Sequence, residues 1–389
     1  MYVRISGRVR LNAHSLNAQG GGGSNYIEAT KTKVTVKTDN GWAVVEVPAI
    51  TGNMVKHWHF VGFVDYFRKT PFKDNLTERA LRYNGTRFEP IERRSQWEIP
   101  KAGNQKIIFK KNNKKWYLIS APNFSGGEEA SEAHFIKYFA DADIHGFLAP
   151  GMNIRRVSLV KTSFIVPTED FVRAVEGERL INSIKHNRVD VNEKGAIGSS
   201  EEGTAQMLFS REYATGLYGF SVVLDLGFVG IPQSSPTKVE NNELKSNIVI
   251  DPTERKERIK SALLALIPML SGYIGANLAR SFPLMKVEEF IAVASEESIP
   301  ALVHGFYEDY VEASRAIVEN ARGLGFNINA FEYNISCGDD SRKEDTPKES
   351  RFVKDAKKVS SVEGLVNELL SLLNGKSGKA KGNEEGGSN

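Results

Sequence analysis

The sequence predicts an α+β domain of the ferredoxin-like, RRM-like type that carries two insertions. Strand and helix patterns follow one another in the order strand, helix, strand, strand, helix, strand once the insertions are set aside. The segments that interrupt this order are rich in basic residues or glycine instead of periodic apolar residues. The chain has 389 residues, of which 40% are hydrophobic. That length suffices for a large core and about two to three domains.

The first strand is expected over residues 2–13. Apolar residues occupy its odd positions and polar residues its even positions, among them Arg4, Arg8 and Arg10. Alternation with a period of two is typical of a half-buried strand, so the even positions should form a basic and polar outer face. A flexible, glycine-rich loop follows over residues 16–25.

A hairpin and a helix come next. The strands "KVTVKT" and "WAVVEV" flank Asp39-Asn40-Gly41, and Asn-Gly favours a type I′ turn, in which both central residues have positive φ. Pro48 ends the hairpin. A helix is expected over residues 53–68, because its apolar side chains form one stripe.

Residues 69–120 differ in composition from the segments around them. They are rich in arginine and lysine, and no acidic residue lies between Lys101 and Lys115. We expect this segment to be an insertion that projects from the core.

Strand patterns return at residues 157–167 and in two later runs, "AQMLFSREY" and "LYGFSVVLDL". A polar, glycine-rich tract, residues 185–203, lies between the pattern at residues 157–167 and "AQMLFSREY". A long helix should then begin with Asp251 as N-cap and Pro252 at its first position, and continue to Arg280 with a kink near Pro268.

The C-terminal part divides into three segments. Residues 339–361 are rich in charge and should be a solvated linker. An apolar stripe at helical spacing predicts a helix from residue 362 to 375, and residues 376–389 should be disordered. The expected division of the chain is a core of residues 1–68 and 121–338, an insertion of residues 69–120, a linker with a helix over residues 339–375, and a tail of residues 376–389.

Several classes of protein are excluded by composition. Cys337 is the only cysteine, so one chain can form neither a disulfide nor a cysteine-based zinc site, and a reducing compartment is favoured. The strand at the N-terminus leaves no room for a signal peptide. Residues 262–279 are apolar but contain proline and glycine, which favours a buried helix over a membrane span. We therefore expect a cytoplasmic protein without membrane contact.

No metal or cofactor site is expected. His57 and His59 are two positions apart on a predicted helix, about 200° around its axis, and cannot hold one ion together. His134 and His145 have no partner at ligand spacing. The loop "GGGGSN" lacks the Lys-Ser/Thr of a phosphate-binding P-loop.

Basic residues beside turns and strand ends are a more informative feature. Such residues could neutralise the phosphates of an RNA backbone, which a net charge of only +3 permits if the residues are clustered. Each could equally be an ordinary solvated charge, and Arg280 could instead complement a helix dipole. Three nearby aromatic residues could stack on bases or belong to the core: Phe164, Tyr213 and Tyr218.

Several motifs follow one another in a characteristic order along the chain. They are "ISGRVRLNAHSLNA", "VPAITGNMVKHW", "DADIHGFLAP", "VKTSFIVP", "IKHNRV" and "LLALIPMLSGYIGANLAR". Their order and spacing from about residue 1 to 330 resemble the backbone subunits of archaeal type I-A CRISPR Cascade complexes, the Cas7 or DevR group of the RAMP superfamily. The charged tail beyond Asp339 departs from that pattern.

The resemblance implies an RRM-like palm, with residues 69–120 as fingers and residues 185–203 as a β-hairpin thumb. Copies of such a subunit form a helical filament along a guide RNA (crRNA), present it for pairing with target DNA, and contact other Cascade subunits. It implies no catalysis and no cofactor. The residues expected to bind RNA are Asn12, His14, Asn25, Lys56, Arg155, Arg156, Lys161, His186, Arg188, Arg211 and Arg280.

Two other functions stay open. Related RAMP proteins process crRNA by acid–base catalysis, for which His14 or His186 could serve. Others cut target RNA with an acidic residue after the first strand, but no Asp or Glu precedes Glu28 here. A stand-alone RRM protein that binds single-stranded nucleic acid is the second alternative, although the first strand lacks an aromatic cluster.

Overall fold

The computed structural model describes most of the chain. The described residues are 1–17, 19–20, 26–85, 96–100, 106–113, 115–121, 124–175, 180–188, 207–271, 282, 284–335 and 350–379.

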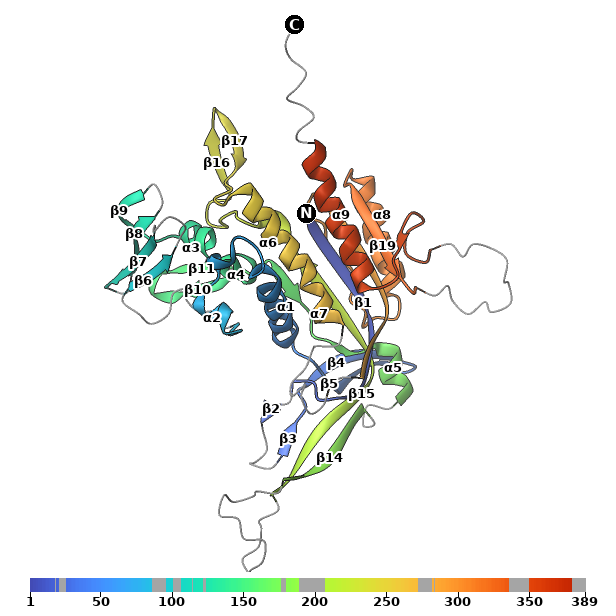
Figure 1. Ribbon diagram of the computed structural model, residues 1–389. Coiled ribbons are helices and arrows are strands. Elements are labelled where there is room, and N and C mark those ends of the chain that lie inside the picture. The colour runs from blue at the N-terminus through green and yellow to red at the C-terminus, as the bar shows by residue number, and fades with distance from the viewer. Residues whose placement is uncertain are drawn as a thin grey trace, which may run out of the picture.

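The centre of the molecule is a mixed sheet built around β1 (Tyr2–His14). The strand pairs antiparallel with β15 (Met207–Leu224) on one side and with β18 (Leu284–Ser295) on the other, so that Ile5 lies between Val222 and Ala292. β15 also pairs antiparallel with β12 (Val160–Thr162), which gives the strand order β18-β1-β15-β12. Further strands extend the sheet (Figure 1): β2 (Gln19–Gly20), β3 (Tyr26–Glu28), β13 (Val166–Pro167), β14 (Ile181–Arg188), β19 (Ile328–Tyr333) and β20 (Lys357–Lys358).

Helices cover both faces of this sheet. One face packs against α1 (Gly52–Phe67), α6 (Pro252–Leu264), α7 (Leu266–Leu270) and α9 (Val362–Lys379), around a core that includes Ile5, Phe63 and Leu263. The other face packs against α8 (Tyr310–Gly323), through residues such as Ile291 and Val311.

The prediction that the even positions of β1 face solvent is therefore wrong for its first half. The side chain of Arg4 is only 5% exposed, and it forms an ion pair of 2.9 Å with Asp225 and donates to the carbonyl of Ile299. Arg8 donates to the carbonyl of Gly305. The segment around residues 299–307 thus covers the face of β1 formed by its even-numbered residues, which the sequence pattern identifies only as polar.

Two glycines, Gly305 of this segment and Gly219 of β15, allow the segment to approach the sheet closely. A Cβ on Gly305 would lie 2.0 Å from the carbonyl oxygen of Gly7, and a Cβ on Gly219 would lie 2.2 Å from the nitrogen of Phe306. Both distances are far below any real Cβ contact. The two layers can touch here only because these residues have no side chain.

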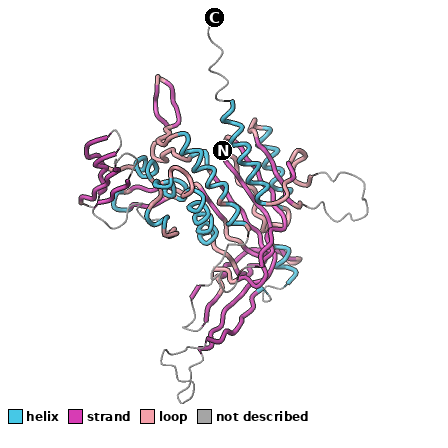
Figure 2. The backbone as a smooth tube through the Cα atoms, viewed as in Figure 1, coloured by secondary structure: helices cyan, strands magenta, loops and turns pink. Residues whose placement is uncertain are grey.

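A second unit with its own core lies beside the sheet (Figure 2). Its core is rich in aromatic side chains, including Phe109, Trp116, Phe135 and Phe147. Because that core includes residues well beyond position 120, the unit is larger than the predicted insertion. Its elements are β6 (Gln96–Pro100), β7 (Lys106–Asn112), β8 (Lys115–Ala121), β9 (Phe124–Glu129), α3 (Glu132–Tyr138), α4 (Ala140–His145), β10 (Phe147–Ala149) and β11 (Ile154–Arg156).

Three hairpins stand out from the two cores. β14 and the first half of β15 form one at the lower end of the molecule in Figure 1, where the predicted thumb lies, and residues 189–206 of its tip lie outside the described residues. The other two are β4 (Lys31–Thr38) with β5 (Gly41–Pro48), and β16 (Thr237–Glu240) with β17 (Glu243–Ser246).

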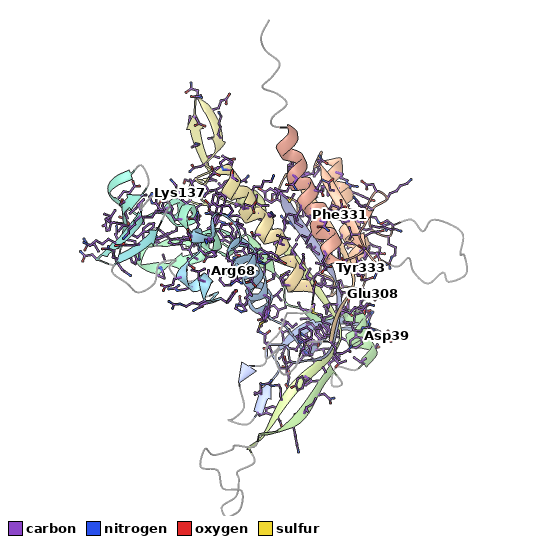
Figure 3. All side chains as sticks on the ribbon, viewed as in Figure 1. Asp39, Arg68, Lys137, Glu308, Phe331 and Tyr333 are labelled. Carbon is purple, nitrogen blue, oxygen red and sulfur yellow. The ribbon has the colours of Figure 1, made fainter. Side chains whose placement is uncertain are left out.

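The turn between β4 and β5 differs from the predicted type I′ turn. Thr38 pairs with Gly41, so Asp39, labelled in Figure 3, and Asn40 occupy the turn itself. Of these residues only Gly41 has a positive φ, of 119°. The Asn-Gly pair therefore uses the freedom of its glycine alone.

The predicted N-cap at Asp251 is confirmed, whereas the cap at Thr51 was not predicted. The carboxylate of Asp251 accepts hydrogen bonds from the Thr253 and Glu254 amides at the start of α6, and Thr51 caps α1. α6 ends at Leu264, because Pro268 has no N–H to donate to the Leu264 carbonyl. The remaining helical segments are α2 (Glu78–Leu81), α5 (Glu169–Val175) and short 3₁₀ turns at Lys73–Asn75, Pro150–Met152 and Leu226–Phe228. Within the described residues, no helix has the length and apolar character needed to span a membrane.

The C-terminal helix is part of the core and not a peripheral segment. Leu365, Val366 and Leu369 of α9 are buried against α6 and α7. The helix also continues to Lys379, beyond the predicted end at residue 375. Before it, Phe352 and Val353 are buried on the other face of the sheet, so the prediction of a solvated linker is wrong for these two residues. Residues 339–349 of the predicted linker lie outside the described residues.

We predict that Leu369→Ala lowers the free energy of unfolding by about 2–5 kcal/mol, because it leaves a cavity in the main core. Asn367→Ala, two residues earlier on the exposed side of the same helix, is the matched control and should change it by less than about 0.5 kcal/mol. Urea unfolding of both variants measures the difference. Equal stabilities would show that α9 does not pack as described.

A buried histidine pair links α1 to α4 and α6. His59 Nε2 lies 2.9 Å from the carbonyl oxygen of Ala262, and its Nδ1 lies 3.0 Å from His145 Nε2. The carbonyl can only accept, so Nε2 carries the proton and Nδ1 accepts from His145. Burial lowers the pKa of His59 to about 4.

This pair predicts a loss of stability in mild acid. The unfolded chain takes up a proton at His59 from about pH 6.5 downward, while the folded chain resists protonation until about pH 4. At pH 5 the folded state should be less stable than at pH 7 by about 2 kcal/mol from this group. His59→Asn should flatten the dependence between pH 7 and 5 in chemical unfolding, and an unchanged slope would contradict this assignment.

Candidate nucleic-acid interface

The end of β1 lies at the base of the β14–β15 hairpin. His14 pairs with Ala214 of β15 across a bulge, and the amide of Ala13 donates to the Thr215 hydroxyl at 3.0 Å. Ala13 has a positive φ of 49°. The structure thus places the predicted residues Asn12 and His14 near the part of β15 that carries Arg211.

The side chain of His14 is buried inside this junction. Its imidazole is fully buried, and its Nδ1 accepts a hydrogen bond of 2.9 Å from the amide of Leu16, which has a positive φ of 47°. A side chain in this position cannot reach a bound phosphate. His14 is therefore a structural residue in this conformation, contrary to its prediction as an RNA contact.

The loop after β1 is also tied to the start of α1. Asn17 donates to the Thr51 hydroxyl at 2.6 Å and accepts from the Thr51 amide at 3.2 Å. Thr51 is at the same time the N-cap of α1. Asn17 is absent from the predicted set, because the cap signal "ITGN" before the helix points to Thr51 and not to its partner.

Arg211 is the predicted residue whose surroundings best suit an anion. It lies in β15, opposite Ile184 of β14 and beside Ile27 of β3. Its side chain is half-buried, and its Nε is enclosed without a hydrogen-bond acceptor among the described residues. A guanidinium in such a place can form charge-assisted hydrogen bonds with a phosphate oxygen.

Glu212, the next residue, holds the neighbouring segment in place. Its carboxylate accepts from the Tyr26 hydroxyl at 2.7 Å, the Ala29 amide at 2.9 Å and Lys31 Nζ at 3.5 Å. Burial alone would raise the pKa of Glu212, but these hydrogen bonds lower it overall. The carboxylate thus stays ionised and fixes β3 and the start of β4 beside Arg211.

The other predicted cations do not gather at this junction. Lys161 lies opposite Val223, twelve residues along β15 from Arg211 or about 40 Å of extended strand. Its ammonium pairs with Asp225 at 2.5 Å while 55% of its side chain is exposed. Lys56 donates to the His145 carbonyl at 2.9 Å, and Arg155 is exposed on β11.

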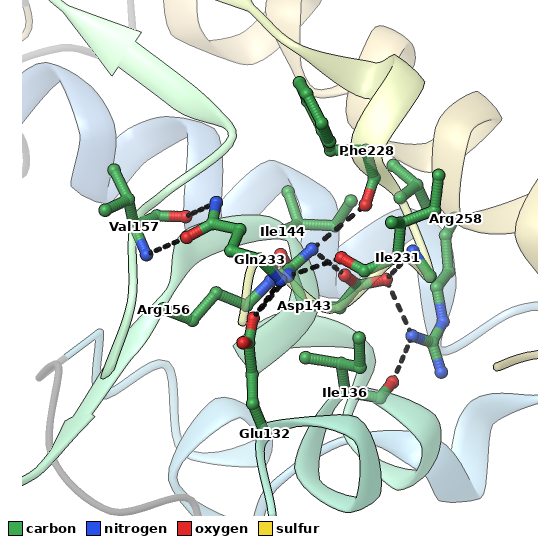
Figure 4. Close-up of polar contacts among 12 residues, drawn as sticks. Glu132, Ile136, Asp143, Ile144, Arg156, Val157, Phe228, Ile231, Gln233 and Arg258 are labelled. Carbon is green, nitrogen blue, oxygen red and sulfur yellow. Dashed lines mark hydrogen bonds and ion pairs between the residues drawn. The ribbon is translucent and has the colours of Figure 1, made fainter. Parts of the chain in front are cut away.

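Arg156 is the clearest correction to the predicted set. Its guanidinium is fully buried and pairs with Glu132 at 2.9 Å and Asp143 at 2.5 Å (Figure 4). It also donates to the carbonyls of Ile231 and Phe228. All of its donors are used inside the protein, so Arg156 is not available to RNA.

Part of the predicted set cannot be placed. Asn25 and Arg280 lie outside the described residues, and so does most of the predicted thumb. The backbones of His186 and Arg188 lie in β14, opposite Phe209 and Met207. Of the three aromatic candidates, Phe164 is 48% exposed, whereas Tyr213 and Tyr218 are buried.

The described residues offer little for catalysis. His304 Nε2 lies 2.8 Å from the Ser163 hydroxyl, but its Nδ1 accepts from the Phe306 amide, so Nε2 carries the proton and cannot act as a base toward Ser163. Within the described part of the chain, no group of three or more His, Cys, Asp or Glu residues could hold a metal ion.

Comparison with known proteins identifies the family. The family model described as CRISPR-associated negative auto-regulator DevR/Csa2 matches residues 5–315. The chain belongs to the DevR/Csa2 family. A curated relative from Methanocaldococcus jannaschii, named CRISPR-associated protein Cas7/Cst2/DevR, is 58% identical over 96% of this chain and 100% of its own length.

More distant DevR/Csa2 relatives cover most of the chain as well. A protein of the same name from Thermoproteus tenax is 29% identical over 95% of this chain and 94% of its own. The aCascade subunit Cas7/Csa2 2 of Saccharolobus solfataricus is 26% identical over 82% and 88%. One chain of a CRISPR RNA-guided surveillance complex superposes with a TM-score of 0.48 at 9% identity, covering 96% of this chain and 100% of that chain.

The burial of Arg156 gives a prediction that separates it from its neighbour. Arg156→Ala should lower the free energy of unfolding by about 3–5 kcal/mol, because it leaves buried carboxylates without their cation. Arg155→Ala, which removes the same charge from an exposed position, should change it by less than about 0.5 kcal/mol. Chemical denaturation of both variants tests this, and comparable losses would contradict the buried cluster.

Proposed function

We propose that this chain is the non-catalytic, RNA-binding backbone subunit of a CRISPR Cascade effector complex of type I-A. Copies of the chain polymerise along a guide RNA and present it for pairing with target DNA. The family membership and the name of the Saccharolobus relative, an aCascade subunit, support this function. Its partners are the guide RNA, target DNA through that RNA, further copies of itself and other Cascade subunits, in the cytoplasm.

The observation that carries the proposal is the environment of Arg211. An enclosed N–H without an acceptor is costly in a folded protein, by about 1–3 kcal/mol. A phosphate oxygen would supply the missing acceptor and the opposite charge. Contacts to the backbone, not to base edges, are what a subunit needs to grip guides of any sequence.

The fold offers a frame for such a grip. The order β18-β1-β15-β12, with α1 following β1 and α6 following β15, supports a ferredoxin-like palm. The unit around β6–β9 would then be the fingers, and the β14–β15 hairpin the thumb that crosses the guide RNA. Residues proposed to line the track besides Arg211 are Asn12, Asn25, Lys56, Arg155, Lys161, His186, Arg188 and Arg280.

Arg211→Ala should weaken binding of a single-stranded RNA about tenfold or more, because a charge-assisted contact is lost. The RNA affinity of Arg211→Lys should lie between those of Arg211→Ala and the wild type, since lysine keeps the charge but not the forked geometry. The slope of log affinity against log salt should shrink by about 0.7 in Arg211→Ala. Fluorescence anisotropy at several salt concentrations measures both.

Lys358→Ala is the matched control, because it removes one exposed cation from β20, at the far edge of the sheet from β15. Its affinity should equal that of the wild type. If Arg211→Ala also binds like the wild type, Arg211 does not contact RNA.

A further inference from the structure

The β4–β5 hairpin has two different faces. Its inner face is packed, with Val36 and Val47 buried against Val172 of α5. Its outer face consists of three cross-strand pairs, each with one residue on β4 and one on β5. These pairs are Lys37 with Trp42, Thr35 with Val44, and Lys33 with Glu46.

Trp42 is the unusual residue on this outer face. It is 71% exposed, and its neighbour Val44 is 69% exposed. Tryptophan is normally buried over much of its surface, and an exposed, rigidly held ring is typical of a residue that meets a partner. The packed inner face fixes the hairpin, so the ring is presented on a stable support.

The charges around Trp42 favour an anionic partner. Lys33 and Lys37 are exposed and form no ion pair with any described residue, and Glu46 is the one carboxylate among the six outer-face residues. The two lysines lie on one strand about 13 Å apart, since they are four positions apart in the sequence. Lysine is depleted in the centres of protein–protein interfaces, which makes a protein partner a poorer match.

An ion pair between Lys31 and Glu212 links the β4–β5 hairpin to the β14–β15 hairpin. Lys31 is the first residue of β4, and Glu212 is the neighbour of Arg211. From Lys31 to Lys37 the strand spans about 20 Å. A flexible polyanion on this side of the hairpin could follow β4 from Lys31 as far as Trp42.

We propose that the outer face of the β4–β5 hairpin binds single-stranded nucleic acid, with one base stacked on Trp42 and phosphates beside Lys33 and Lys37. Stacking on an aromatic ring tolerates any base, because every base has a flat π-face. The nature of this ligand rests on the proposed function, whereas the site itself adds a stacking platform that a track of cations lacks.

The first test uses the full-length protein with labelled oligouridine and oligothymidine of about twelve nucleotides, measured by anisotropy. Trp42→Leu keeps an apolar side chain but removes the ring, and should weaken binding about tenfold. Trp42→Phe keeps an aromatic face and should retain most of the affinity. A larger effect on one oligomer identifies RNA or DNA as the natural ligand.

The second test concerns the lysines. The double variant Lys33→Ala and Lys37→Ala should weaken binding and reduce the salt slope by about 1.4, for two phosphates. Lys238→Ala with Lys245→Ala is the matched control, because it removes two lysines that face each other on the β16–β17 hairpin. That control should leave both the affinity and the slope as in the wild type.

Three results would overturn the site. Wild-type affinity in Trp42→Leu would show that no base stacks there, and equal losses in both lysine pairs would reduce the effect to net charge. Reduced self-association of Trp42→Leu without RNA, at unchanged affinity, would assign the face to a second copy. Failure of the wild type itself to bind either oligomer would instead refute the proposed function.

Discussion

Asp143 holds the two cores of this molecule together. One oxygen of its buried carboxylate lies 2.5 Å from a nitrogen of Arg156, and the other lies 2.8 Å from Arg258. The second oxygen also accepts the amide of Gly230 at 2.9 Å. Asp143 and Arg156 belong to the unit around β6–β9, whereas Arg258 lies on α6 against the central sheet.

The surrounding residues complete the neutralisation of these charges. Glu132 pairs with Arg156, and Glu254 pairs with Arg258 and accepts from the side-chain Nδ2 of Asn75. Isolated buried charges would be strongly destabilising, whereas a cluster in which each group is paired and hydrogen-bonded tolerates its loss of water. Because these contacts are directional, they fix the orientation of one unit against the other as well as their proximity. The placement of any RNA-facing surface on the two units depends on this junction.

Local sequence signals correctly predicted individual helices and strands, because caps and apolar periodicity depend on neighbouring residues. The Asp251 cap, the apolar stripe of α1 and the alternation of β1 all predicted elements that the structure contains. Alternation reports which residues share a face, but not what covers that face. The residue that covers Arg4 is Ile299, which lies 295 positions further along the chain, and no pattern near β1 indicates this contact.

Local patterns also could not show which of the predicted site residues are exposed, because distant parts of the chain determine their burial. Arg155 and Arg156 are adjacent and chemically identical, and only the fold decides that one is exposed and the other buried between Glu132 and Asp143. His14 was chosen for its chemistry, but its position at a bulge turned it inward. Trp42 is not among the residues predicted from the sequence to contact RNA. Its exposure follows from the register with Lys37, which a shift of one residue would reverse.

Electron microscopy of the protein copurified with its RNA tests the central claim most directly. A backbone subunit that binds the phosphates of a guide should form curved or helical filaments, and their length should increase with the length of the bound RNA. Nuclease treatment should shorten or dissolve them. Single, separate particles at every RNA length would contradict the account.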